Sequence, residues 1–231
     1  MMVMQGNFYF PLLTRQPIEE YHNIHGEFYA ASNYQQNYDM VAKDCKYRCV
    51  YCDVTVKECG GEPLSLDHFR PKALFVDKFD GILVRHPYNL HLSCQKCNVL
   101  KSKDWQGCKE TIDGSTYLDG KGYIDRFEQN LLDFIEVDAG GRIQAKEAAL
   151  GDKGPGAYMI NRLHLNRPNR VYLRKKRHVE NLASEIENLL LEYSKSVTNN
   201  CEAGLVSPEK GMANISKLNN ITECFLNTKK L

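Results

Sequence analysis

The chain has 231 residues, enough for one sizeable core or for a small catalytic module with a helical partner, but too few for two large domains. Its composition, 42% hydrophobic and 26% charged, excludes a disordered chain and predicts a folded globular protein. The formal net charge of +1 excludes a global positive field, so any nucleic-acid partner must be held by local basic patches.

Targeting features are missing from the sequence. No stretch approaches the roughly 18 uninterrupted apolar residues that cross a bilayer. Residues 1–13 lack the basic region and the small-residue cleavage site of a signal peptide. We therefore expect a cytoplasmic protein with no membrane partner.

The first half of the chain divides into two predicted segments. Residues 1–44 form an N-terminal lead-in with two short helical pieces, Ile18–Tyr29 and Tyr34–Val41. Residues 45–110 form the chemical module, in which short β-prone runs alternate with turn residues. These runs include Pro63–Phe69 and Ile82–Arg85.

The second half is predicted to hold a β-hairpin and then two helices. Residues 111–197 contain the hairpin and a long stretch, Gly156–Val197, whose apolar residues recur at helical spacing. Pro168 divides this stretch into two helices that form a helical hairpin. Residues 198–231 are a polar tail that predicts little. The strands of the β-hairpin are Leu132–Val137 and Arg142–Gln144.

Four of the nine cysteines predict a structural zinc site. They form two C-x2-C pairs, Cys49/Cys52 and Cys94/Cys97, and each pair can present two thiolates to one tetrahedral zinc. The alternative is a set of buried free thiols. Cys45 competes with Cys49 as a ligand, but its spacing from a partner is looser.

An Asp-His pair and two asparagines lie between and directly after the two cysteine pairs. Asp67 and His68 end an alternating apolar run that Pro71 stops, which indicates a pair presented at a strand end. Asn89 lies shortly before the second pair, and Asn98 directly follows it. The segment between the pairs is longer than the roughly 15–20 residues of a simple zinc ribbon, so it must be more than a loop.

Asp-His, then Asn, then C-x2-C-Asn-x2-Lys is the order of motifs in the HNH nucleases, and the chain resembles this family over Cys49–Trp105. The resemblance implies an α+β fold, in which a zinc-stabilised ββα-metal (HNH) catalytic module is flanked by α-helices. It also implies hydrolysis of phosphodiester bonds in nucleic acid, with DNA favoured over structured RNA.

The same resemblance implies a role for each polar residue. His68 is the general base that takes a proton from the attacking water, and Asn89 bonds the hairpin backbone and so orients His68. Asp67 and Asn98 hold a catalytic Mg²⁺ or Mn²⁺, for which carboxylate and amide oxygens are suitable hard ligands. Because neighbouring residues of a regular strand point to opposite faces, the strand must break or twist at Asp67 and His68 for both to serve one site.

Each of these residues also has an ordinary structural reading. Asp67 could cap a turn and His68 could be a surface histidine, while Asn89 and Asn98 could be turn or cap residues. Near this motif, candidate phosphate contacts are Lys72, Lys101 and Lys103. Two further histidines, His86 and His91, are equally compatible with substrate contact and core packing, and the basic run 167–178 is equally compatible with a phosphate-binding surface and a solvated helix face.

Flanking patterns extend the resemblance to the PtuB effectors of Septu and retron-associated antiphage systems. They are Asp67–Lys72, Tyr88–Asn98, the Gly140–Ile143 turn and Leu163–Asn166. This similarity implies a toxic nuclease that a PtuA-like ABC-type ATPase keeps in check, and, as a further partner, a retron reverse transcriptase with its RNA–DNA. The alternative function is a zinc-stabilised binding or adaptor module without catalysis.

Overall fold

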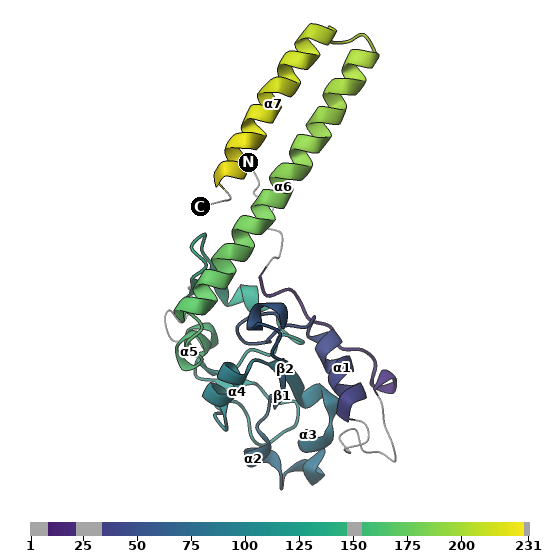
Figure 1. The fold of residues 1–231 in the computed structure, drawn as a ribbon. Helices are drawn as coiled ribbons and strands as arrows, with labels where there is room; N and C mark the ends of the chain where they lie inside the picture. Colours follow the sequence, from purple (N-terminus) through teal and green to yellow (C-terminus); the bar gives the residue numbers. More distant parts are fainter. Residues whose placement is uncertain (1–8, 22–33, 147–153, 229–231) are drawn as a thin grey trace. The chain divides into compact units, whose positions relative to one another are not determined.

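A computed structural model describes residues 9–21, 34–146 and 154–228 of the chain (Figure 1). The chain divides into two compact units, Met1–Lys175 and Lys176–Leu231. The boundary falls inside a long helix and inside the segment 111–197 that the sequence predicts as one domain. Among the helices that the structure describes, none combines the length and apolar composition that a membrane crossing requires.

Two short strands and a helix lie at the centre of the first unit (Figure 1). Strand β1 (Ser65–His68) pairs antiparallel with β2 (Leu90–Ser93), and Asp67 lies opposite His91. Helix α4 (Gln95–Lys101) begins two residues after β2 ends. The local order is therefore strand, strand, helix, within a mixed fold of helices and small two-stranded sheets.

Short helices fill the chain between β1 and β2, and one of them corrects a prediction. Ile82–Arg85 forms a helix and not the β-prone segment expected, because the backbone N–H of His86 donates to the carbonyl of Ile82 at 2.8 Å. A four-residue segment with three apolar residues is too short for its periodicity to distinguish a strand from a helix. The elements are α2 (Lys72–Phe75), η3 (Phe79–Gly81), α3 (Ile82–Arg85) and η4 (Pro87–Asn89).

The N-terminal segment packs beside this centre. The helix predicted at Tyr34–Val41 is confirmed as α1 (Tyr34–Asp44). Of the helix predicted at Ile18–Tyr29, the structure shows one 3-10 turn, η1 (Ile18–Glu20), and residues 22–29 lie outside the described residues. A further 3-10 turn, η2 (Lys57–Cys59), follows the first cysteine pair.

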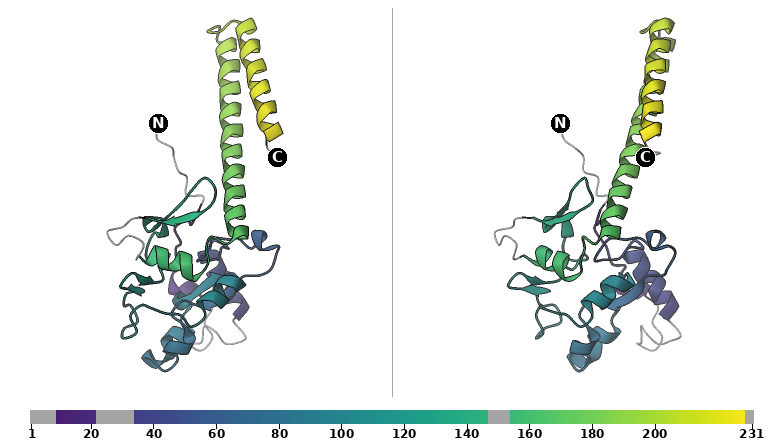
Figure 2. Two further views of the ribbon diagram at one scale, coloured as in Figure 1. Left: turned by 90° about the vertical axis from the view of Figure 1, so that its left-hand side faces the viewer. Right: turned by 60° about the vertical axis from the view of Figure 1, so that its left-hand side comes forward.

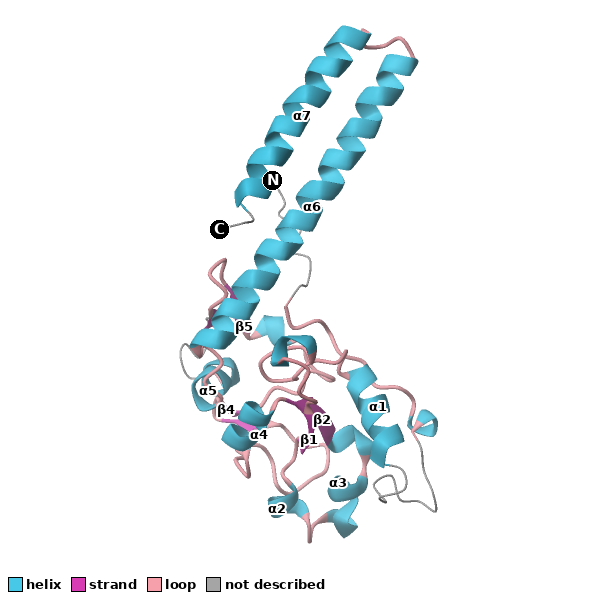
Figure 3. Cartoon of the chain, viewed as in Figure 1, coloured by secondary structure: helices cyan, strands magenta, loops and turns pink. Residues whose placement is uncertain are grey.

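Two small hairpins follow α4 (Figure 3). The predicted hairpin of the second half is confirmed, and its turn residue Gly141 has a φ of +82°. A Cβ at Gly141 would lie 2.4 Å from the carbonyl oxygen of Val171, so only glycine allows this close approach. The elements are β3 (Tyr117–Leu118), β4 (Lys121–Gly122), η5 (Leu131–Asp133), β5 (Ile135–Val137) and β6 (Ile143–Ala145).

Three helices complete the chain: α5 (Pro155–Arg162), α6 (Pro168–Glu202) and α7 (Pro208–Thr228). Pro168 separates α5 from α6 as predicted. The prediction of a helical hairpin made by these two helices is wrong, because α6 pairs antiparallel with α7 in the segment 198–231 that was read as a tail (Figure 2). Gly211 of α7 lies beside Cys201 of α6, and a Cβ at Gly211 would lie 2.2 Å from the Cys201 Sγ.

Aromatic side chains pack the end of β1 into the core of the first unit. The ring of Trp105 meets those of Phe69 and Phe75 edge-on, with centroid distances of 5.6 and 6.0 Å. The Arg70 guanidinium lies 4.9 Å from the Trp105 ring centroid and donates to the carbonyl of Gly114 at 2.7 Å. The residues that follow Asp67 and His68 are therefore fixed by packing on several sides.

Candidate active site and metal centre

Four buried thiols converge where β2 is followed by α4. The Sγ atoms of Cys49, Cys52, Cys94 and Cys97 all lie within 4.8 Å of one another, and each residue is at most 3% exposed. The first pair lies in a tight turn, closed by the bond from the Asp53 N–H to the Cys49 carbonyl at 2.9 Å. The second pair spans the start of α4.

This geometry fits a zinc ion. A tetrahedron with Zn–S bonds of about 2.3 Å has sulfur atoms roughly 3.8 Å apart, and the Cys52 and Cys94 Sγ atoms are 3.7 Å apart. The four cysteines could therefore hold a structural zinc, as the spacing predicts. Cys45 is not part of the cluster, because its sulfur accepts the backbone N–H of Leu92 at 3.3 Å.

The imidazole of His68 has one defined partner. Its Nε2 lies 3.0 Å from the carbonyl oxygen of Val84 in α3, and because a carbonyl only accepts, Nε2 carries the proton. Nδ1 is then the nitrogen with a free lone pair. The side chain is half-buried, and desolvation by burial lowers the pKa of His68 below its ordinary value.

Asn89 fastens the end of β1 to α3. Its Oδ1 accepts the backbone N–H of Arg70 at 2.8 Å, and its Nδ2 donates to the carbonyls of Arg70 at 3.0 Å and Leu83 at 2.6 Å. The side chain is buried, so these bonds satisfy the whole amide. The carbonyl of Leu83 directly precedes that of Val84, so Asn89 fixes the segment that holds His68.

Asp67 is engaged by two neighbours that the sequence analysis did not pair with it. Lys101 Nζ lies 3.0 Å from its Oδ2, and the hydroxyl of Tyr51 donates to the same oxygen at 2.5 Å. Lys101 also donates to the carbonyl of His68 at 2.9 Å. Burial raises the pKa of the Tyr51 phenol, which therefore remains a donor.

Asp67 and His68 point to opposite sides of β1. The strand stays regular through His68, which pairs with Leu90, so the break expected at this point does not occur. Asp67 faces Tyr51 and Lys101, whereas His68 faces Val84. Asn98 is half-buried on α4, three residues before Lys101 and therefore on the same side of the helix.

The three predicted phosphate contacts differ in exposure. Lys72 and Lys103 are exposed at the start of α2 and just after α4. Lys101 is 0% exposed, so the expectation that it contacts phosphate is corrected: it is the counter-ion of Asp67. Lysine is almost never fully buried unless it is paired with a carboxylate, so an exposed Lys101 was expected. The spacing of residues along the sequence did not show that Asp67 would be its partner.

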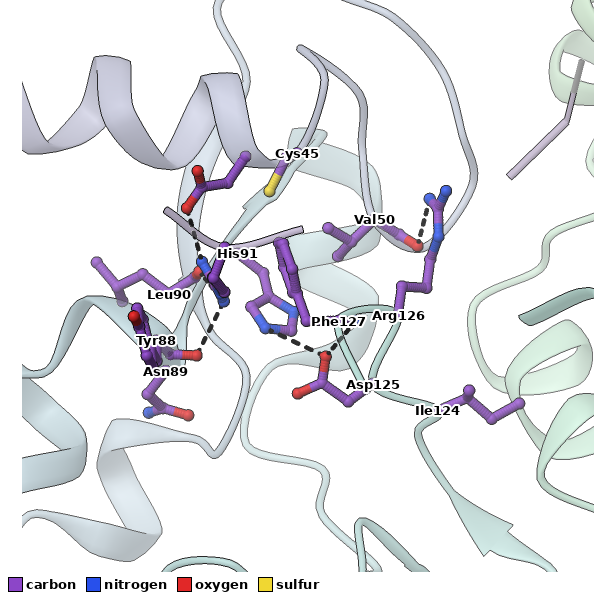
Figure 4. A network of polar contacts seen from close by, with 12 residues as sticks. Cys45, Val50, Tyr88, Asn89, Leu90, His91, Ile124, Asp125, Arg126 and Phe127 are labelled. Atoms are coloured by element: carbon purple, nitrogen blue, oxygen red, sulfur yellow. Dashed lines mark hydrogen bonds and ion pairs between the residues drawn. The ribbon is translucent and has the colours of Figure 1, made fainter. Parts of the chain in front are cut away.

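The two further histidines considered from the sequence have structural partners, and Figure 4 shows those around His91. His91 is 1% exposed and stacks on Phe69 with a centroid distance of 4.4 Å, which favours core packing over substrate contact. Its Nε2 lies 3.8 Å from Oδ1 of Asp125. His86 accepts the backbone N–H of Tyr88 at 3.2 Å and so caps η4.

The basic run 167–178 divides between the two kinds of position: Lys175 and Lys176 are exposed, as on the solvated helix face considered from the sequence, whereas three arginines are not. Arg167, Arg170 and Arg174 recur on one side of the helix and turn inward. Arg174 is 1% exposed and donates to the carbonyls of Gly141 at 2.7 Å and Leu165 at 2.8 Å. Arg167 and Arg170 reach the sulfur cluster.

A second polar cluster has no motif in the sequence. Asp104 accepts hydrogen bonds from the hydroxyls of Tyr123 and Tyr158, both at 2.6 Å, and lies 3.2 Å from Arg162. Tyr158 and Arg162 also line an open cavity of about 760 Å³. These partners come from distant parts of the chain, so no local spacing could reveal them.

Comparison with protein-family profiles, curated proteins and solved structures finds no match for this chain. The functional assignment therefore rests on the residues and on their geometry.

Proposed function

We propose that this chain is an endonuclease of the HNH type that hydrolyses phosphodiester bonds of nucleic acid, DNA in preference to RNA. The observation that carries the proposal is the setting of His68. One ring nitrogen is bound to the carbonyl of Val84, and Asn89 holds the neighbouring carbonyl of Leu83. A half-buried histidine that is fixed through one nitrogen and free at the other has the form of a general base.

In the proposed reaction His68 Nδ1 accepts a proton from the water that attacks phosphorus, the bond from phosphorus to the 3′ oxygen breaks, and this leaving oxygen takes a proton from solvent water. The lowered pKa of His68 keeps the imidazole neutral at physiological pH, which this step requires. The fixed Nε2–H donates to Val84 and stabilises the orientation of the ring in both protonation states. Lys72 and Lys103 are exposed near the motif and are the proposed contacts for substrate phosphates.

The ligands that the family resemblance assigns to a catalytic metal do not fit that role as arranged. The Asp67 carboxylate is already neutralised by Lys101 and hydrogen-bonded by Tyr51. Both close contacts are to Oδ2, while Oδ1 lies 3.4 Å from the Lys101 Nζ, so a Mg²⁺ or Mn²⁺ ion at Oδ1 would lie beside a buried ammonium that repels it. Binding of a divalent cation at Asp67 would therefore compete with Lys101.

The Lys101–Asp67 pair also supports the second candidate function, a zinc-stabilised nucleic-acid-binding or adaptor module without catalysis. In that protein the buried carboxylate would only stabilise the hairpin. For the nuclease, we further propose the role of a toxic antiphage effector restrained by a PtuA-like ATPase, on the similarity of the flanking motifs.

The experiment is a cleavage assay with the purified full chain, tested with and without the PtuA-like ATPase. Plasmid DNA and total RNA are incubated in Mg²⁺, in Mn²⁺ and in excess EDTA. His68→Ala of matched zinc content is the test variant, and His86→Ala, which removes the cap of η4, is the matched control.

Cleavage by wild type and His86→Ala, but not by His68→Ala, supports the nuclease and identifies its substrate. Activity that is lost in EDTA shows that the reaction needs a divalent cation, whereas activity that survives EDTA supports a reaction without one. Binding of nucleic acid without cleavage in every arm, with all proteins folded, would favour the adaptor module.

A further inference from the structure

Two arginines at the start of α6 lie against the cluster of four cysteines. Arg167 Nη2 is 3.4 Å from the Cys97 Sγ, 3.6 Å from that of Cys94 and 3.7 Å from that of Cys52. The four sulfur atoms form a tetrahedron. Because Arg167 Nη2 is nearly equidistant from three of them, it covers the face that these three define.

Arg170, in the first turn of α6, approaches the same cluster. Its Nη2 is 3.7 Å from the Cys94 Sγ and 4.0 Å from the Sγ of Cys59, which is not one of the four clustered cysteines. Arg167 and Arg170 are both half-buried. Their stems therefore lie along the protein surface while their charged groups meet the thiols.

Charge explains why arginine is suited to these positions. A Zn²⁺ ion bound by four thiolates leaves the centre with two negative charges, and burial of that charge is unfavourable unless it is compensated. Two guanidinium groups supply two positive charges and remain protonated at any physiological pH. N–H···S hydrogen bonds to ligating sulfur atoms are the outer-shell contacts that orient and stabilise a metal site.

We propose that Arg167 and Arg170 form a guanidinium cap that neutralises the zinc–thiolate centre and makes zinc occupancy and the anchoring of the first turns of α6 mutually dependent. The zinc ion then stabilises the start of a long helix as well as the two cysteine pairs. Because such coupling is reciprocal, loss of the cap weakens zinc binding by the same factor by which loss of zinc weakens the anchoring.

The contacts predict an order of effects. Arg167 Nη2 lies within 3.7 Å of three ligating sulfur atoms and Arg170 Nη2 lies at 3.7 Å from that of Cys94, so Arg167→Met should lose more zinc affinity than Arg170→Met. Methionine keeps an apolar stem of similar length and removes the charge. Lys175→Met is the matched control, because Lys175 is an exposed cation on the same helix.

The first measurement is zinc affinity in the full chain, by competition with a chromophoric chelator at fixed pH and ionic strength. The expected losses are about tenfold or more for Arg167→Met, several-fold for Arg170→Met and less than twofold for Lys175→Met. Equal affinities for all four proteins would overturn the proposal. If Arg167→Met does not fold, Arg167→Lys keeps the charge without the fork, and Arg170→Met still tests the cap.

The second measurement is amide hydrogen exchange in the first turns of α6, with zinc bound and after its removal. Zinc removal should raise exchange there in wild type, and much less in Arg170→Met, where the coupling is already weakened. If zinc removal does not change the rate of amide exchange in the first turns of wild-type α6, the proposed coupling is wrong. Neither readout depends on nuclease activity, so the cap can fail while the proposed function stands.

Discussion

His68 and Asn89 are bound to consecutive carbonyl oxygens of α3, those of Val84 and Leu83. Asn89 also binds both the N–H and the carbonyl of Arg70, just beyond the end of β1. The strand that carries the imidazole and the helix that orients it are therefore held together by one amide side chain. These contacts are consistent with the role of orienting His68 that the resemblance to HNH nucleases implies for Asn89.

Asn89→Ala should lower both stability and cleavage. The substitution leaves buried backbone groups of Arg70 and Leu83 without partners, which costs about 1–3 kcal/mol in the free energy of unfolding. Urea denaturation measures the stability, and single-turnover cleavage under conditions where the variant is fully folded measures the second effect. Asn130→Ala, which removes the cap of η5, is a control that should leave cleavage unchanged. Wild-type cleavage by folded Asn89→Ala would show that the amide does not orient His68.

Lys101→Met should destabilise the protein strongly, because it leaves the Asp67 carboxylate buried without its counter-ion. Breaking a buried ion pair in this way costs about 3–5 kcal/mol, whereas replacing both partners costs less. The double variant Asp67→Asn/Lys101→Met should therefore be more stable than Lys101→Met alone. Exposed Lys103→Met should change stability by no more than about 0.5 kcal/mol. Equal effects at Lys101 and Lys103 in chemical denaturation would contradict the buried pair.

Zinc should be bound by the four clustered cysteines and by no other thiol of the chain. Elemental analysis of purified protein should give one zinc per chain for wild type and for Cys108→Ser, and much less for Cys97→Ser. Chelation of zinc should also remove the near-ultraviolet circular dichroism of the module, since the two cysteine pairs join its ends. Full zinc content in Cys97→Ser would be inconsistent with this site.

Asp125→Asn should stabilise the protein at neutral pH. Burial raises the pKa of Asp125 to about 6, so the folded state takes up this proton as pH falls through 6 and the unfolded state only near 3.8. The charged carboxylate is therefore unfavourable above pH 6, by up to about 3 kcal/mol, and the advantage of Asn should fade between pH 6 and 4. Denaturation across this range, with exposed Glu128→Gln as control, tests the sign. An advantage that does not change with pH would contradict it.

As pH falls, His91 lowers the stability of the folded state, whereas Asp125 raises it. Burial, together with the nearby charges of Arg15, Lys101 and Arg126, lowers its pKa well below the ordinary value. The unfolded state then takes up this proton first as pH falls below about 6.5, and stability decreases.

Local sequence patterns predicted much of the site. The cysteine spacing indicated the metal cluster, and the alternating run before Asp67 indicated β1, because ligand spacing and strand alternation are both local properties. The hairpin at Gly141 and the division at Pro168 were also correct for this reason. Helix α7 was missed because its apolar pattern is weak, and Ile82–Arg85 was misread because four residues carry no resolvable period.

Partnerships between distant residues could not be predicted from the sequence. Lys101 was expected at a phosphate, yet its ammonium is buried against Asp67, 34 residues away. The inward turn of Arg167 and Arg170 depends on where the start of α6 lies beside the thiols. Such contacts are decided by tertiary packing, which one sequence without its fold does not specify.

The most direct test of the central claim is the pH dependence of single-turnover cleavage by wild type and His68→Ala. Because burial lowers the pKa of His68, the wild-type rate should rise with pH and level off at a lower pH than it would for a histidine of ordinary pKa, with His68→Ala at least about 100-fold slower on the plateau. A His68→Ala protein that cleaves at the wild-type rate across the same pH range would contradict the assignment of His68 as the general base.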